Sequence, residues 1–171
     1  MIVDGLKAAA LLFVAAIAQV SILAGVDVFG GTPDLVLVTL VSLALLNGAI
    51  FGAVAGFCVG LVVDVGTFAT LGFTSLLLTT AGYWIGRYGE TTGRGRTRAP
   101  YLSVAVVTVL VAFGALALHF MLGQNAPARV VLVDALPPSL LLNLLLTAPV
   151  FALCRRLLRR EERVPEVQLL G

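Results

Sequence analysis

Long runs of apolar residues, interrupted by few charges, constrain this chain more than any other feature of its sequence. A helix that crosses a bilayer needs about 20 mostly apolar residues, because the hydrocarbon layer is about 30 Å thick and each residue adds about 1.5 Å. Of the 171 residues, 60% are hydrophobic and 12% are charged, whereas soluble domains carry about 25% charged residues. The chain has too much apolar surface for one water-soluble core. We therefore expect an all-α integral membrane protein.

The apolar runs predict a bundle of six transmembrane helices. The region 35–63 is too long for one helix, and Asn47-Gly48 interrupts it. Because Asn-Gly is typical of turns, we interpret this region as a tight hairpin of two short helices, which packing inside the bundle or local bilayer thinning can accommodate. We predict one transmembrane domain over 1–163 and a cytoplasmic tail at 164–171. The predicted helices cover 6–24, 33–46, 49–64, 71–86, 101–122 and 139–154.

The distribution of charge predicts that both termini are cytoplasmic. Lys and Arg favour cytoplasmic loops, and with six spans every Lys and Arg except Arg129 falls on that side. A five-span alternative would move the N-terminus and Lys7 outside, which fits the charges less well. The longest outer loop is predicted at 123–138. The acidic residues predicted on the outer side are Asp27, Asp34, Asp64 and Asp134.

A stripe of glycines is the most specific local pattern. Gly48, Gly52, Gly56 and Gly60 recur every four residues and lead to Asp64. Because four residues turn a helix by about 400°, Gly52, Gly56 and Gly60 share one face. Small residues at this spacing let another helix backbone approach closely. Two interpretations stay open, namely tight packing inside this bundle and a docking face for the helix of a partner.

Polar residues at helix ends and inside the last helix are further candidates. Asp34, which follows Pro33, can accept backbone N–H groups at a helix start. Asp64 is interpreted either as a solvated helix end or as a polar contact that fixes a loop or a partner, since a carboxylate near hydrocarbon is costly. Asn143 and Thr147, four residues apart, are expected to hydrogen-bond neighbouring helices.

The sequence contains no pattern that indicates catalysis. Ser75 and His119 are predicted at similar depth, but no oxyanion-hole motif accompanies Ser75. Neither a metal-binding helix motif nor a phosphate-binding loop occurs. The arginine clusters flank predicted spans, so they are better explained by topology than by nucleic-acid binding. We expect no enzymatic activity and no cofactor.

A series of short motifs between residues 33 and 87 resembles the MreD family of rod shape-determining proteins. In chain order the motifs are Pro33-Asp34-Leu35, Gly52-Ala53-Val54-Ala55-Gly56-Phe57, Gly60-Leu61, Asp64, Leu71-Gly72 and Gly82-Tyr83-Trp84-Ile85-Gly86-Arg87. Outside this region the resemblance rests on size, number of spans and a basic C-terminus. From these motifs we take the candidate residues for contact with a partner, which are Pro33, Asp34, Gly52, Gly56, Gly60, Asp64 and Gly72.

The resemblance implies a non-catalytic scaffold in the bacterial inner membrane that links peptidoglycan synthesis to cell shape. The implied partners are membrane lipids, a single-span MreC-like protein, the RodA glycosyltransferase with its transpeptidase, and MreB. The resemblance also implies a fold similar to the substrate-binding subunit of energy-coupling-factor transporters, so a small-solute transporter subunit is the alternative function. The first helix lacks the Ala-x-x-x-Ala pair with which such subunits dock.

Overall fold

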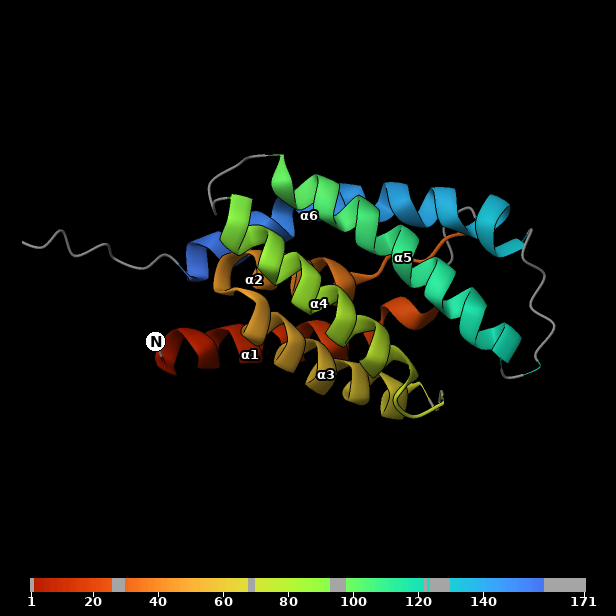
Figure 1. The fold of residues 1–171 in the computed structure, drawn as a ribbon, viewed down its shortest axis with the longest axis horizontal. Coiled ribbons are helices and arrows are strands. Elements are labelled where there is room, and N and C mark those ends of the chain that lie inside the picture. Colours follow the sequence, from red (N-terminus) through yellow and green to blue (C-terminus); the bar gives the residue numbers. More distant parts are fainter. Residues whose placement is uncertain are drawn as a thin grey trace, which may run out of the picture.

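The computed structural model describes residues 2–25, 30–67, 70–92, 98–121, 123 and 130–158. Within these residues the chain forms six α-helices and no strand, so the predicted all-α class is confirmed. The helices are α1 (Ile2–Ser21), α2 (Leu35–Asn47), α3 (Ala49–Gly66), α4 (Phe73–Thr92), α5 (Ala99–Met121) and α6 (Leu136–Leu157) (Figure 1). A short 3-10 helix, η1 (Leu23–Gly25), follows α1, and a π-helical turn, η2 (Val130–Ala135), leads into α6.

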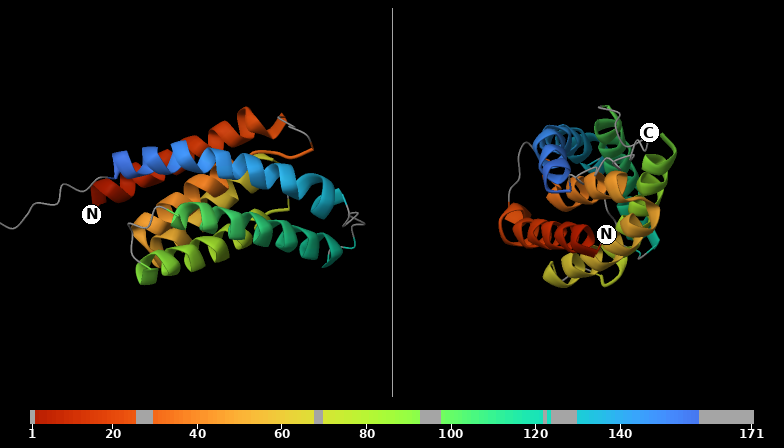
Figure 2. Two further views of the ribbon diagram at one scale, coloured as in Figure 1. Left: turned by 90° about the horizontal axis from the view of Figure 1, so that it is seen from above. Right: turned by 90° about the vertical axis from the view of Figure 1, so that its left-hand side faces the viewer.

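Helix α2 forms the centre of the bundle. Each of the other five helices packs against it, and the end-on view shows it surrounded by them (Figure 2). Every residue from Val36 to Leu45 is buried, as expected for a helix that is apolar on all sides. With 13 residues, or about 20 Å, α2 is shorter than a hydrocarbon layer of about 30 Å. It is therefore a core helix around which the longer helices are arranged.

The turn between α2 and α3 is a single residue long. Helix α2 ends at Asn47 and α3 begins at Ala49. Gly48 between them has a φ of +102°, which favours glycine over residues with a Cβ. Its backbone N–H donates to the carbonyl oxygen of Ala44 over 2.8 Å and closes the last turn of α2. This geometry is the hairpin expected from Asn47-Gly48.

The prediction of a loop up to residue 138 is wrong for its second half. Residues 130–135 form η2, and α6 begins at Leu136. Pro137 and Pro138 therefore lie in the first turn of α6, where a missing backbone N–H costs no intrahelical hydrogen bond. Other predictions concern residues outside the described part of the structure. They are the rest of that loop except Gly123, the positions of Asp27, Arg94, Arg96 and Arg129, and the tail at 164–171.

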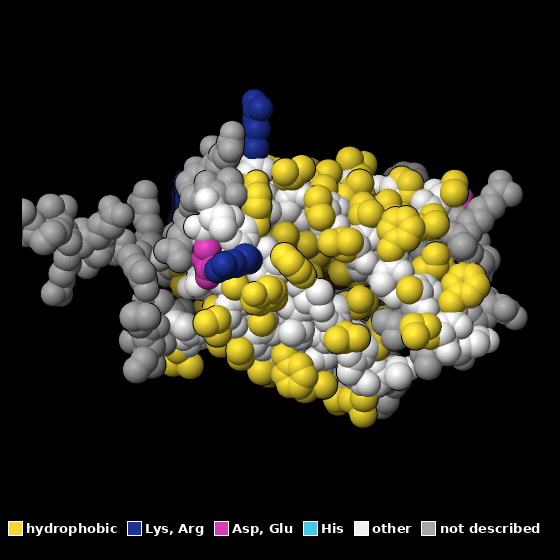
Figure 3. Space-filling model, viewed as in Figure 1, with side chains coloured by type: hydrophobic (Ala, Val, Ile, Leu, Met, Phe, Trp, Pro, Cys, Tyr) yellow, Lys and Arg dark blue, Asp and Glu magenta, His cyan; other side chains and the backbone are white. Residues whose placement is uncertain are grey.

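The exterior of the bundle has the apolar character of a surface that faces lipid. Among the described residues, three segments are long and apolar enough to cross a membrane, namely Ala49–Gly66, Ala99–Ala117 and Leu132–Leu157, and two apolar helices are shorter, Gly5–Ser21 and Leu35–Asn47. Hydrophobic side chains are spread over the whole described part of the face in Figure 3. Consecutive helices run in opposite directions, so the first and last described residues lie at the same end (Figure 1).

Candidate functional site

The glycines of α3 lie in direct contact with the backbone of α4. A Cβ added to Gly52, Gly56 or Gly60 would overlap backbone atoms of α4. Those atoms belong to Gly82, Leu78 and Ser75, respectively. Helices α3 and α4 accordingly form the most extensive helix pair of the described chain. We call this contact the glycine seam.

Helix α4 contributes glycines of its own to the seam. A Cβ on Gly82 would overlap the carbonyl oxygen of Gly52, and one on Gly86 would overlap the backbone of Gly48. Gly82 and Gly86 were not among the residues predicted from the sequence to contact a partner. Their spacing of four residues, which matches the spacing in α3, was the pattern that could have identified the second half of the seam.

The seam bears out the interpretation of the stripe as tight packing inside the bundle. Helix α4 occupies the face shared by Gly52, Gly56 and Gly60, so a partner helix could dock on these glycines only if α4 moved away. An apolar groove elsewhere on the surface is a more accessible place for such a helix.

Asp64 closes the glycine seam at the end where α3 finishes and α4 begins, which we call the Asp64 end. Its carboxylate accepts hydrogen bonds from the backbone N–H groups of Gly72 (2.8 Å), Thr74 (3.1 Å) and Ser75 (3.4 Å). These amides belong to the start of α4 and have no partner within that helix. Asp64 is only 1% exposed, so the predicted solvated helix end is wrong. The alternative of a polar contact that fixes a loop describes the geometry.

Glu90 caps a helix start in the same way at the opposite end of the glycine seam, which we call the Glu90 end. Its Oε1 accepts from the backbone N–H of Ala49, the first residue of α3, over 2.9 Å. Its Oε2 lies 3.4 Å from Nη1 of Arg87. Each helix of the pair thus caps the first turn of the other. Glu90 was not predicted from the sequence, although an acidic residue in the last turns of a helix opposes the helix dipole and indicates a partner elsewhere.

A separate polar cluster holds the start of α2. Asp34 is the N-cap of α2, and its Oδ1 accepts from the backbone N–H of Leu37 over 2.8 Å, which confirms the capping prediction. The Gln19 side chain of α1 binds both sides of Asp34: its Nε2 donates to the carbonyl oxygen of Pro33 (3.1 Å), and its Oε1 accepts from the N–H of Leu35 (2.9 Å).

Asn143 connects this cluster to α5 and α6. Its Oδ1 accepts from the backbone N–H of Asp34 (2.8 Å), and its Nδ2 donates to Oγ1 of Thr108 (3.1 Å). The expected interhelical bond is therefore present for Asn143. Thr147 differs, because its hydroxyl donates to the carbonyl oxygen of Asn143 in its own helix over 2.7 Å, a common way for a buried threonine to satisfy its hydroxyl.

The structure thus distributes the candidate partner residues over two clusters. Pro33 and Asp34 lie at the start of α2, whereas the other five belong to the glycine seam and its cap at Asp64. Each carboxylate in these clusters accepts from backbone N–H groups, so each has a structural role in the fold.

The described residues do not assemble the features of a catalytic or metal centre. They contain no group of three or more His, Cys, Asp or Glu side chains that could hold a metal ion. The Ser75 hydroxyl donates to the carbonyl oxygen of Phe57 over 3.0 Å, and the side chain of His119 lies outside the described part of the structure.

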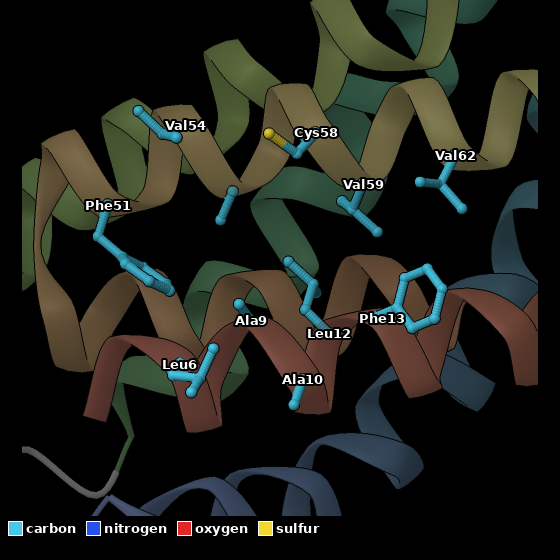
Figure 4. Close-up of a pocket in the computed structure, with 11 residues that line it drawn as sticks. Leu6, Ala9, Ala10, Leu12, Phe13, Phe51, Val54, Cys58, Val59 and Val62 are labelled. Carbon is cyan, nitrogen blue, oxygen red and sulfur yellow. The ribbon is translucent and has the colours of Figure 1, made fainter. Parts of the chain in front are cut away.

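An apolar groove of about 470 Å³ lies between α1 and α3 and opens on the side of the bundle. Figure 4 shows Phe51 and Phe13 toward its two ends, with small residues between them. Its lining contains no charged residue. Such a surface suits a hydrocarbon chain or the apolar face of another helix, since small side chains allow close approach. We call it the α1–α3 groove. It is lined by Leu6, Ala9, Ala10, Leu12, Phe13, Phe51, Val54, Ala55, Cys58, Val59 and Val62.

The family model described as rod shape-determining protein MreD matches residues 3–160. Neither a curated protein nor a solved structure matches the chain. The likeness to the substrate-binding subunit of energy-coupling-factor transporters therefore stays a prediction.

Proposed function

Because the chain belongs to the MreD family of rod shape-determining proteins, we propose that it is a non-catalytic membrane scaffold of the bacterial cell-elongation machinery. Membership of the family makes it a membrane protein with a role in determining rod shape. The proposal adds that the chain carries out no reaction itself and links peptidoglycan synthesis to cell shape through partners.

The observation that carries this proposal is the use of the buried polar side chains. Asp64 and Glu90 accept from the first turns of α4 and α3, and Asn143 joins α6 to α5 and to the start of α2. An active site needs a nucleophile, acid or base that is directed at a substrate. Here these groups are directed at the backbone and, for Asn143, also at the Thr108 hydroxyl, and they hold helices together, as expected of a scaffold.

The proposed principal partner is an MreC-like protein anchored by a single spanning helix. The glycine seam is filled by α4, so we assign the partner helix to the α1–α3 groove. Ala9, Ala55 and Cys58 in its lining are small, which favours close approach of a second helix. The RodA glycosyltransferase with its transpeptidase, and MreB, are further proposed members of the same assembly.

The proposed location is the bacterial cytoplasmic membrane, with six spans and both termini inside. Helices α4 and α6 end, and α5 begins, near the basic residues Arg87, Arg98, Arg155 and Arg156. Basic residues favour the cytoplasmic side of a membrane. The Glu90 end of the bundle is therefore proposed to face the cytoplasm.

Depletion of the protein in a rod-shaped host tests the proposed function. We expect depleted cells to become round, because insertion of new peptidoglycan would no longer be coupled to the elongation machinery. Cell width and length are measured by microscopy, and re-expression of the intact chain is expected to restore the rod. Cells that keep their shape but lose uptake of a vitamin or metal would contradict the proposal and favour the transporter-subunit alternative.

A further inference from the structure

A second groove, between α4 and α5, combines an apolar interior with a basic rim. It has a volume of about 390 Å³. Leu76, Thr80 and Trp84 line it from α4, and Val106 and Leu110 line it from α5. Helices α4 and α5 make much less contact with each other than α3 and α4 do, because the seam glycines of α4 face α3. We call this gap the α4–α5 groove.

The basic rim begins within one helical turn of the groove. Arg87 follows Trp84 by three residues, so its Cα lies about 4.5 Å farther along the axis of α4. It also lies seven residues after Thr80, which places both on one face of the helix. Its side chain is 62% exposed. Arg98 is exposed and directly precedes α5 at the same end.

The surface around the groove is likewise divided into an apolar region and a basic end. In Figure 3 the Lys and Arg side chains visible on this face lie at the end of the molecule where α4 finishes and α5 begins. Hydrophobic side chains are spread over the rest of the described surface on this face, among uncharged polar side chains and backbone. A ligand that matches this division has an apolar chain and an anionic head.

The acidic side chain at this rim leaves Arg87 able to bind an anion. Glu90 lies 3.4 Å from one guanidinium nitrogen of Arg87 through Oε2, while its Oε1 accepts from Ala49. A guanidinium has five N–H donors, so one contact leaves others available. Among the described residues of 87–98, Arg87 and Arg98 outnumber the single Glu90, so the described charge at this end is positive.

We propose that the α4–α5 groove binds one anionic phospholipid of the surrounding leaflet. An acyl chain lies between α4 and α5, the phosphate binds Arg87, and Arg98 adds positive charge at the same end. Basic pockets between helices on the cytoplasmic side are suited to phospholipid head groups. Trp84 lies at the Arg87 side of the groove and packs edge to face with Tyr83, with ring centroids 5.8 Å apart; aromatic side chains favour the membrane interface. This site is independent of the proposed scaffold function.

Trp84 makes the proposal directly measurable, because it lines the groove and is the only tryptophan in the chain. The purified full chain is placed in phosphatidylcholine vesicles that contain increasing amounts of phosphatidylglycerol with brominated acyl chains. Bromine quenches tryptophan fluorescence on contact, so quenching reports the lipid next to Trp84. We expect phosphatidylglycerol to bind there at least about fivefold more strongly than brominated phosphatidylcholine, the preference that one nearby arginine provides.

Three variants distinguish a site from general attraction to a basic surface. Arg87→Gln combined with Arg98→Gln is expected to abolish the preference, so that quenching follows the bulk lipid composition. Arg155→Gln combined with Arg156→Gln removes the same charge from exposed positions at the end of α6 and is expected to preserve it. Thr80→Phe keeps the charge but fills the groove, and is expected to reduce quenching by the brominated anionic lipid.

Two results would overturn the proposal. One is quenching of the unaltered protein that follows bulk lipid composition. The other is an equal loss of preference in the α6 double variant, which would indicate nonspecific surface attraction. Circular dichroism of each variant in the same vesicles checks that the helices are intact, and the Thr80→Phe variant tests the site without any change at Arg87 and its contact with Glu90.

Discussion

At the scale of single residues, the hydrogen bonds of Asp64 explain why α4 begins where it does. Gly72, with a φ of +89°, turns the chain so that its own N–H and those of Thr74 and Ser75 point at one carboxylate. These donors would otherwise be unsatisfied inside an apolar bundle, where no water replaces the lost bond. The same carboxylate joins the end of α3 to the start of α4.

Replacing Asp64 by alanine is therefore expected to destabilise the bundle. The loss of a cap costs about 1 kcal/mol, and leaving buried donors unsatisfied adds about 1–3 kcal/mol. For a chain of this size we expect the melting temperature in detergent to fall by roughly 5–10 °C.

The exposed Asp134 provides a matched control, because it is an acidic residue of the segment that leads into α6. Asp134→Ala is expected to change the free energy of unfolding by less than about 0.5 kcal/mol. Equal shifts in melting temperature for Asp64→Ala and Asp134→Ala would contradict the capping role of Asp64.

The sequence indicates only those caps whose partner is close along the chain. Asp34 was recognised because an N-cap contacts an amide three residues later, here that of Leu37. Asp64 reaches amides 8 to 11 residues away across a turn, and Glu90 reaches Ala49 from 41 residues away. Hydrogen bonds between residues so far apart in the sequence depend on how α3 and α4 pack, which no local pattern specifies.

At the scale of helices, the glycine seam determines how α3 and α4 pair. Glycines on both helices bring the backbones into contact, and Asp64 and Glu90 cap the pair at its two ends. Because van der Waals packing replaces the hydrophobic effect as the main attraction between helices in lipid, the fit along the seam stabilises this pair. Any side chain in the seam must push the helices apart.

Gly56→Ala tests this statement with the smallest possible change. Its Cβ would overlap the carbonyl oxygen of Leu78, so we expect a destabilisation of about 1–3 kcal/mol from overpacking. The adjacent variant Phe57→Leu changes a side chain that is exposed, and its effect is expected to stay below about 0.5 kcal/mol. Thermal unfolding in detergent measures both, and equal tolerance of the two changes would contradict the seam.

The sequence predicted where the helices lie more accurately than where each helix begins and ends. Asn47-Gly48 indicated the hairpin because a turn of one residue needs a conformation that glycine adopts easily. The helical segment 130–138 was missed because two prolines suggested a boundary, whereas proline is equally compatible with the first turn of α6. The pairing partner of the α3 stripe was missed because the glycines of α4 lie in a more polar helix than those of α3.

At the scale of the whole molecule, alternation of helix direction places the first and last described residues at one end (Figure 1). Arg87 of α4, Arg98 just before α5, and Arg155 and Arg156 of α6 lie at that end as well. Together these features support a six-span topology with the Glu90 end in the cytoplasm.

Reporter fusions test this topology. A reporter that is active only outside the cytoplasm is expected to be inactive when fused after residue 92 or after residue 163, and active when fused near residue 130. The charge of the arginine segments provides the physical reason, since basic loops resist transfer across the membrane. An active reporter at the N-terminus would instead favour five spans.

We propose that this chain acts by holding a partner's spanning helix, and site-specific crosslinking in native membranes detects that contact. A photoreactive residue at Val54 of the α1–α3 groove is expected to crosslink an MreC-like single-span protein. The same residue at Leu141, an exposed position on α6, serves as the control and is expected to crosslink mainly lipid. Crosslinking of that partner equally from both positions, or of a transporter component from Val54, would contradict the account.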